Sequence, residues 1–293
     1  MKFKGIIPAL VTPLNSDESI NIPVLHSLIE FLYSKGADGF YIGGATGEGL
    51  ALRTKERMLL AREAINATNG RVQCIVQVAA TDFNEAIALA KQAEEVGADA
   101  ISATPPLFFQ YSEDNVYNYY KALADSVHIP VMIYYSPAAG FTMSARFAAR
   151  MFEVDNITAI KWTSSDYYEL MRLKDLTHGE MNIINGPDEM LLMGLNAGAD
   201  GGIGTTYNFM FDTIRAVYDN FVKGDIATAH FHQMSAVRII DELKKYQVIP
   251  ATKVILEKLG FAVGNATFPM TRYSEEEKNI ILDGMKKAGL DFI

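Results

Sequence analysis

The segment QCIVQVAATDFNEAIALAKQAEEVGADAISA, residues 73–103, decides the fold class. It begins with a short apolar run at 73–78 and ends with another at 98–103. The stretch between the two runs has the three- and four-residue spacing of an amphipathic helix, carried by Ala86, Ile87, Leu89, Ala90 and Ala93. This order predicts a strand, a helix and a second strand in one βαβ unit, from which parallel sheets are built.

The same alternation continues on both sides of this unit, with runs that start roughly 20–35 residues apart. The strand-like runs are 6–11, 38–42, 73–78, 98–103, 129–134, 157–161, 181–185 and 200–204. Eight such runs equal the strand count of a closed (β/α)8 TIM barrel. The main alternative is an open, doubly wound sheet, but no G-x-G-x-x-G fingerprint follows the first run. We therefore expect a TIM barrel.

The strand signal stops after residue 205, and only helical periodicity follows. Amphipathic segments lie near 208–223, 226–246, 250–259 and 274–288, and Ser274 with three glutamates after it forms a helix N-terminal signature. One of these helices would complete the eighth βα unit. Because no Pro-, Ser- or Gly-rich linker intervenes, we expect a barrel over 1–223 and a C-terminal helical extension over 224–293 that packs on it.

Composition narrows the class of protein. The chain has 293 residues, 49% of them hydrophobic and 21% charged, which is typical of a globular protein. A lone Cys74 fits a reducing compartment, and the N-terminus lacks the apolar stretch of a signal peptide, so we expect a cytoplasmic protein without a membrane partner. A net charge of −9 without a basic cluster argues against nucleic acid as a partner.

Lys161 is the first candidate for chemistry because it closes the run Ile157-Thr158-Ala159-Ile160-Lys161. Barrel enzymes carry their active sites at the C-terminal ends of the strands. Period-two alternation predicts that Lys161 shares the inward face with Ile157 and Ala159. Burial disfavours the ammonium form and favours the neutral amine that attacks carbonyls. The alternative is a solvent-exposed lysine just after the strand.

Tyr134 closes the preceding run and would lie on the adjacent strand. Its phenol could relay protons for the amine. A structural tyrosine at a strand end is the other interpretation, since the chain has 14 tyrosines.

The loop Gly43-Gly44-Ala45-Thr46-Gly47-Glu48-Gly49 follows the second run and precedes a helix that starts near Thr54. Small residues allow backbone N–H groups to approach an anion, and a threonine hydroxyl adds a donor. This composition suits a carboxylate, whereas the absence of the G-K-[ST] ending argues against a Walker-type phosphate loop. A tight strand-to-helix turn would explain the glycines equally well.

Two further loops follow the last two runs. Asp188 and Glu189 come after the seventh run, where they could accept hydrogen bonds from substrate hydroxyls, although Asp188 is also a natural helix cap. No His or Cys is spaced nearby, so we predict no metal site. The loop 202–208 follows the eighth run, and its glycines and hydroxyls suit either ligand contact or barrel closure.

Taken in order, these motifs resemble the pyruvate-dependent class I aldolases of the dihydrodipicolinate synthase and N-acetylneuraminate lyase superfamily. The resemblance covers the whole chain. The motifs that carry it are GGATGE at 43–48, YYSP at 134–137, KWT at 161–163, GPDE at 186–189 and GIGTTYN at 202–208.

The resemblance also favours one branch. The synthase branch has an Arg shortly after the catalytic Tyr, whereas residues 136–140 here read SPAAG, and it has a relay Tyr where this chain has Leu107-Phe108-Phe109. The motifs at 186–189 and 202–208 are similar to those of the lyase branch. Ala45, however, stands where lyases usually have Ser, and Thr205 where Ser is common.

The resemblance implies cleavage of N-acetylneuraminate to pyruvate and N-acetylmannosamine through a covalent imine on Lys161, with no dissociable cofactor. Tyr134 would move the proton. The substrate would be bound by Ala45 and Thr46 at its carboxylate and by Thr163, Gly186, Asp188, Glu189 and Thr205 along its tail. A homotetramer is expected on the same ground.

Two alternatives stay open at the level of sequence. One is the same chemistry on another substrate, as in a 2-keto-3-deoxy sugar acid aldolase or a dihydrodipicolinate synthase. The other is a regulatory barrel without catalysis, against which the retained Lys161 and Tyr134 argue.

Overall fold

The chain folds into a (β/α)8 barrel, as predicted. The computed structural model describes residues 2–291. Each strand-like run overlaps one strand, and the strands are β1 Gly5–Pro8, β2 Gly39–Ile42, β3 Gln73–Gln77, β4 Ala100–Ala103, β5 Val131–Tyr135, β6 Ile157–Trp162, β7 Asn182–Asn185 and β8 Gly201–Gly204.

All strand pairs are parallel, and the order is β1-β8-β7-β6-β5-β4-β3-β2. The remaining gap between β1 and β2 is closed just beyond β1, where Ala9 bridges to Tyr41 and the Leu10 N–H donates to the Tyr41 carbonyl at 2.9 Å. The sheet therefore returns on itself, so both faces of every strand are covered.

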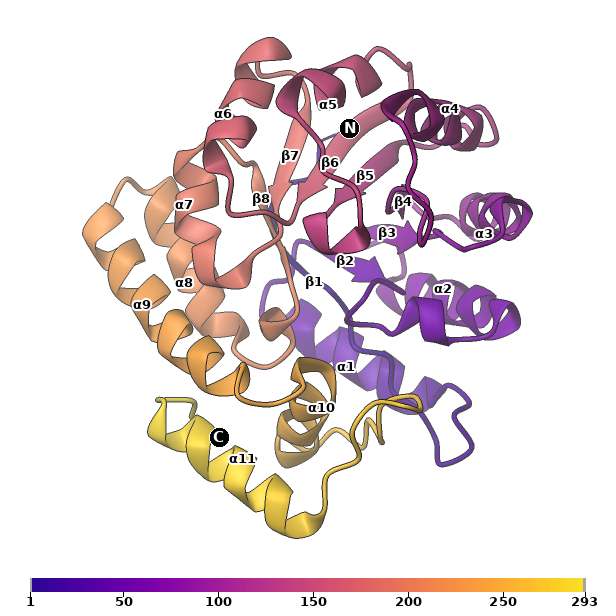
Figure 1. Ribbon diagram of the computed structural model, residues 1–293. Coiled ribbons are helices and arrows are strands. Elements are labelled where there is room, and N and C mark those ends of the chain that lie inside the picture. The colour runs from indigo at the N-terminus through magenta and orange to yellow at the C-terminus, as the bar shows by residue number, and fades with distance from the viewer. Residues whose placement is uncertain (1, 292–293) are drawn as a thin grey trace.

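Helices surround the strands in the alternation that the sequence indicates (Figure 1). The helices of the βα units are α1 Ile22–Ser34, α2 Thr54–Thr68, α3 Phe83–Glu95, α4 Glu113–Ala124, α5 Ala145–Met151, α6 Tyr167–Leu176, α7 Leu191–Asn196 and α8 Phe211–Val222. They are followed by α9 Ile226–Leu243, α10 Val248–Lys258 and α11 Glu275–Lys287. In the part of the chain that the structure describes, none of these helices is both long and apolar enough to cross a bilayer.

The last helix begins where the sequence predicts. The Ser274 hydroxyl accepts from the Glu277 N–H, and the Glu277 carboxylate accepts from the Ser274 N–H, which is a complete capping box. Lys286 and Lys287 lie in its last turn, so the acidic start and basic end both suit the helix dipole.

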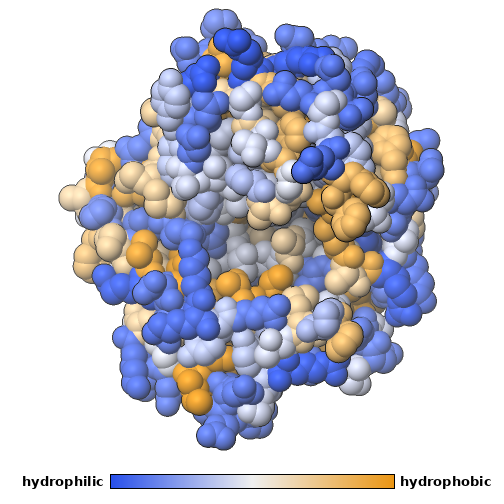
Figure 2. Space-filling model, viewed as in Figure 1, coloured by the Kyte–Doolittle hydropathy of each residue, from blue (hydrophilic) through white to orange (hydrophobic). Residues whose placement is uncertain are grey.

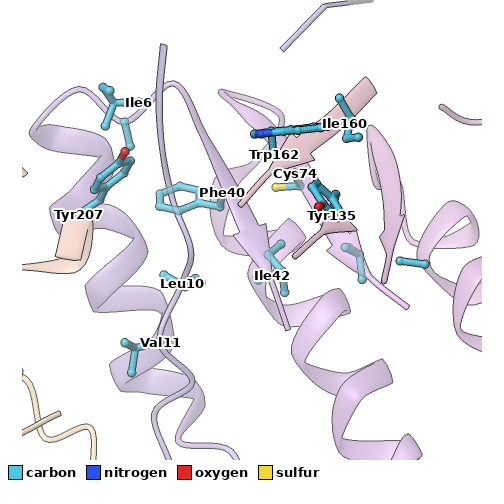
Figure 3. Close-up of a cluster of buried hydrophobic side chains, with 14 of the residues drawn as sticks. Ile6, Leu10, Val11, Phe40, Ile42, Cys74, Tyr135, Ile160, Trp162 and Tyr207 are labelled. Carbon is cyan, nitrogen blue, oxygen red and sulfur yellow. The ribbon is translucent and has the colours of Figure 1, made fainter. Parts of the chain in front are cut away.

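The strands separate two hydrophobic cores. The small inner core fills the barrel, and its members are Phe3, Ile7, Ala9, Tyr41, Ile75, Ala100, Met132, Ala159, Ile184 and Ile203. The larger outer core lies between strands and helices, and Figure 3 shows part of it, including the Tyr135 and Trp162 rings, whose centroids lie 4.6 Å apart. Alternate residues of one strand thus enter different cores.

One prediction about the inward face was wrong. Ala159 belongs to the inner core, but Ile157 belongs to the outer core. The register shifts between Val131 and Met132, which pair with Ile157 and Ala159, so β6 carries one extra residue there. A bulge of this kind breaks the period-two alternation and moves Ile157 to the other side of the sheet.

The buried side-chain amide of Asn208 forms hydrogen bonds that stabilise the closure of the barrel. Its Nδ2 donates to the Ala9 carbonyl at 2.7 Å and the Thr205 carbonyl at 2.8 Å, and its Oδ1 accepts from the Val11 N–H at 3.1 Å. The side chain is fully buried. The single side chain of Asn208 therefore satisfies backbone groups on both sides of the junction between β8 and β1.

We expect Asn208→Leu to lower the free energy of unfolding by about 3 kcal/mol, because it leaves buried backbone groups without partners. Urea denaturation at pH 7 measures this. The control is Asn220→Leu, which removes one bond to the Ala216 carbonyl on α8. Equal losses in the two variants would contradict the role of Asn208 in closure.

Candidate active site

The C-terminal ends of the strands surround two cavities at one face of the barrel. The first cavity, about 390 Å³, is bordered by the segment after β2 and by Gln77, Thr104 and Tyr134. The second cavity, about 400 Å³, is bordered by the segments after β6, β7 and β8 and by residues of α9. The face shown in Figure 2 is hollowed near its centre, over the strand ends seen in Figure 1.

Lys161 lies on β6, between the strands that border the two cavities. Its neighbours in register are Tyr134 on β5 and Ile184 on β7. The residue is only 6% exposed. Its Nζ lies 4.3 Å from the centroid of the Tyr134 ring and 4.6 Å from that of Tyr41.

The amine of Lys161 has aromatic rings for neighbours rather than a counter-ion. Within residues 2–291, no carboxylate lies within 4.0 Å of its Nζ. Because the residue is buried, the alternative of a solvent-exposed lysine is wrong. The geometry leaves a buried amine available to a carbonyl carbon that enters from the strand ends.

Tyr41 belongs to this site, and sequence reasoning missed it. It is fully buried, its hydroxyl donates to Ser102 Oγ at 3.0 Å, and its ring meets Tyr134 edge to face with centroids 6.0 Å apart. Burial raises the pKa of Tyr41 well above its usual value. Its position two residues before the glycine-rich loop, on the inward face of β2, was the available signal.

The threonine hydroxyls of two predicted site loops meet each other. Thr46 Oγ1 and Thr205 Oγ1 lie 2.7 Å apart, which joins the turn after β2 to the turn after β8. Ala45 is exposed and borders the first cavity, whereas Thr205 borders the second. The structure thus brings Ala45, Thr46 and Thr205 together at the C-terminal ends of β2 and β8.

The remaining predicted substrate-binding residues also gather in one place. Thr163, Gly186, Asp188, Glu189 and Thr205 all border the second cavity. A Cβ at Gly186 would lie 2.0 Å from Thr163 Oγ1, so only glycine leaves room for that hydroxyl. Thr163 Oγ1 is buried and has no hydrogen-bond partner among the described residues. The residue borders the cavity, but its hydroxyl oxygen is enclosed next to Gly186.

Asp188 has a structural task that differs from the predicted one. Its Oδ2 accepts from the Thr206 N–H at 2.8 Å and the Thr206 hydroxyl at 2.7 Å. It therefore caps the short 3₁₀ turn Thr206–Asn208 after β8. The alternative prediction, that Asp188 caps the helix that follows it in the sequence, was wrong. A Cβ at Gly204 would lie 2.2 Å from Asp188 Oδ1. The glycine at this position therefore leaves space for the Asp188 carboxylate and not for a ligand.

Glu189 is paired across the second cavity. Its carboxylate forms an ion pair with Lys244, which follows α9. Ile240, Leu243 and Val248 border the same cavity. Sequence reasoning missed these contributions from the C-terminal helices, because nothing in their periodicity marks the side chains that reach the barrel mouth.

The chain is similar to a known protein family over nearly its whole length. The model of the dihydrodipicolinate synthetase family matches residues 2–288. The chain belongs to this family. The N-acetylneuraminate lyase of Rhizobium meliloti (strain 1021) is 36% identical over 279 residues, which cover 94% of this chain and 92% of that protein.

Solved structures of the family superpose closely. The Proteus mirabilis N-acetylneuraminate lyase gives a TM-score of 0.94 at 29% identity, covering 99% of this chain and 100% of that one. A prophage protein of the dihydrodipicolinic acid synthase family from E. coli K12, solved in complex with pyruvate, gives 0.93 at 26% identity and covers 99% of both chains. The backbone is thus shared between branches, and side chains must distinguish them.

The buried Asp188 gives the fold a pH dependence. Burial raises its pKa from 3.8 to about 6, although the Thr206 hydrogen bonds oppose the shift. The folded state therefore holds a proton that the unfolded state has lost between about pH 4 and pH 6, and stability falls as pH rises through that range.

We expect the free energy of unfolding of the wild type to fall by about 3 kcal/mol relative to Asp188→Asn between pH 4 and pH 7. The amide keeps an acceptor for Thr206 and does not ionise. Chemical denaturation of both proteins across this range measures the difference. A difference that is constant, or that grows in favour of the wild type, would contradict the raised pKa.

Proposed function

We propose that this protein cleaves N-acetylneuraminate to pyruvate and N-acetylmannosamine through an imine on Lys161. The observation that carries the proposal is the buried Lys161 amine, held between the Tyr41 and Tyr134 rings at the mouth of the barrel. The relatives named N-acetylneuraminate lyase support the choice of substrate.

The reaction starts with attack of the neutral Lys161 amine on the C2 ketone carbon of the open-chain sugar acid. Loss of water gives a protonated imine, which accepts electrons. Tyr134, next to Lys161 in register, takes the proton of the C4 hydroxyl as the C3–C4 bond breaks. The electron pair of that bond forms an enamine, and N-acetylmannosamine leaves. Protonation at C3 and hydrolysis of the imine release pyruvate and restore the lysine.

The substrate carboxylate would lie at the turn of Ala45 and Thr46. Backbone N–H groups and the Thr46 hydroxyl would bind it, and the Thr46–Thr205 contact orients that hydroxyl. The two ends of the substrate would then lie on opposite sides of Lys161. The carboxylate faces the turn after β2, and the hydroxylated tail enters the second cavity.

Thr163, Gly186, Asp188, Glu189 and Thr205 form the proposed binding surface for the tail. Thr163 and Gly186 border this surface, and Glu189 supplies its accessible carboxylate. Asp188 acts from behind this surface, since its Oδ2 already accepts two hydrogen bonds from Thr206.

Other parts of the proposal concern the whole molecule. The imine chemistry requires no dissociable cofactor and no metal. We propose a cytoplasmic homotetramer in which residues 1–223 form the barrel and 224–293 the extension. Size-exclusion chromatography with light scattering checks the assembly.

Borohydride trapping with N-acetylneuraminate tests the reaction. We expect a three-carbon adduct on Lys161, found by intact and peptide mass spectrometry, because cleavage leaves pyruvate on the amine before reduction. Lys161→Met, which keeps the length of the side chain without an amine, is the control and should give no adduct.

The possible outcomes separate the alternatives. An adduct from pyruvate alone would retain the imine and exclude this sugar acid, leaving a 2-keto-3-deoxy sugar acid aldolase or a dihydrodipicolinate synthase to be separated by product analysis. One observation argues against the synthase alternative: this chain has no Arg shortly after Tyr134, where residues 136–140 read SPAAG. No adduct from either compound would indicate a regulatory barrel.

Glu189→Gln tests the tail-binding surface. We expect KM for N-acetylneuraminate to rise roughly tenfold or more, because hydrogen bonds to a carboxylate are stronger than those to an amide. Imine formation with pyruvate, which has no tail, should be unchanged. Lys244→Met is the matched control, since it breaks the same ion pair but keeps the carboxylate. An equal loss with both compounds in Glu189→Gln would refute the assignment.

A further inference from the structure

The turn at 43–49 is held from two sides. From the barrel side, the Thr12 hydroxyl donates to the Gly47 carbonyl at 2.7 Å. From the other side, the side chain of Glu48 reaches into the C-terminal part of the chain. Ala45 and Thr46, the proposed carboxylate-binding residues, lie within this turn.

The Glu48 carboxylate makes two contacts there. Its Oε1 lies 2.6 Å from Lys253 Nζ, and its Oε2 accepts from the Thr267 N–H at 2.6 Å. Lys253 also donates to the Asn265 carbonyl at 3.0 Å. One carboxylate thus connects the turn both to α10 and to the segment that follows it.

This ion pair is buried more deeply than any other between residues 2 and 291. The exposed fractions of the Glu48 and Lys253 side chains are 0% and 2%. Taking two charges out of water costs several kcal/mol for each, and well-packed apolar residues of similar size give equal or greater stability at such positions. Stability alone therefore does not account for a charged pair here.

Geometry gives a better account of the pair. Glu48 has a φ of 57°, in the left-handed region that residues with a Cβ rarely adopt, and its own N–H closes the turn on the Ala45 carbonyl at 3.0 Å. A backbone in this conformation needs contacts that hold it. The carboxylate supplies them, because Oε2 accepts from the Thr267 N–H and Oε1 lies against the Lys253 ammonium.

We propose that Glu48 and Lys253 are positioning residues, and that through them the C-terminal helices fix the turn that binds the substrate carboxylate. This inference rests on the proposed function of that turn. It gives the extension a role in substrate binding at the carboxylate end, separate from that of α9 at the second cavity.

The experiment measures the pyruvate concentration that gives half-maximal borohydride trapping on Lys161. The variants are Lys253→Met, Glu48→Gln and the double variant Glu48→Gln/Lys253→Met. Glutamine keeps an acceptor for the Thr267 N–H, so the double variant removes both buried charges and leaves no unpaired ion. Arg215→Met is the control, because it breaks an ion pair with Asp38 just before β2, at the opposite end of the barrel.

We expect the half-maximal concentration to rise at least tenfold in Lys253→Met and in the double variant, with trapping at saturation within threefold of the wild type. The double variant should recover the urea midpoint that Lys253→Met loses, but not the affinity for pyruvate. Arg215→Met should keep the wild-type affinity.

A purely structural pair would behave differently. Recovery of both stability and affinity in the double variant would overturn the proposal, as would wild-type affinity in folded Lys253→Met. A double variant that does not fold would assign the pair to the fold alone. If the wild type itself forms no adduct with pyruvate, the proposed function fails, and that result is separate from any comparison among variants.

Discussion

A closed parallel barrel buries both faces of every strand, and the rest of this structure depends on that constraint. Inward residues must fill a narrow interior, and outward residues must pack under helices. Polar chemistry is then excluded from most of each strand and can appear only at the strand ends. Lys161 and Tyr134 lie there, paired in register on neighbouring strands. Their proximity follows from the sheet and needs no special loop.

Much of the fold could be predicted because its signals are local. Runs of β-branched residues, helical spacing between them and the Ser274 cap each depend on a few neighbouring residues. The bulge in β6 escaped prediction, because it depends on how β5 and β6 align and not on either run alone. That shift is why Ile157 faces the helices while Lys161 faces the interior.

The candidate site was predictable only in part, for the same reason. Residues directly after strands were found, since the fold places all strand ends together. Tyr41, Lys244 and Lys253 were missed, although each contacts or supports the site. Their roles come from long-range packing, and their own surroundings in the sequence carry no motif. Asp188 is the opposite case: the sequence marks it as a binding residue, but its carboxylate accepts two hydrogen bonds from Thr206.

The contact from Glu48 to Thr267 spans 219 residues of chain. Synthesis proceeds from the N-terminus, so β1 to β8 are all made before either Lys253 or Thr267 leaves the ribosome. Until then, the turn after β2 lacks both contacts of the Glu48 carboxylate. Lys161 and its strand neighbours are therefore synthesised earlier than the residues that complete this turn. The order of translation separates the synthesis of the proposed nucleophile from that of the groups that hold the proposed carboxylate-binding turn.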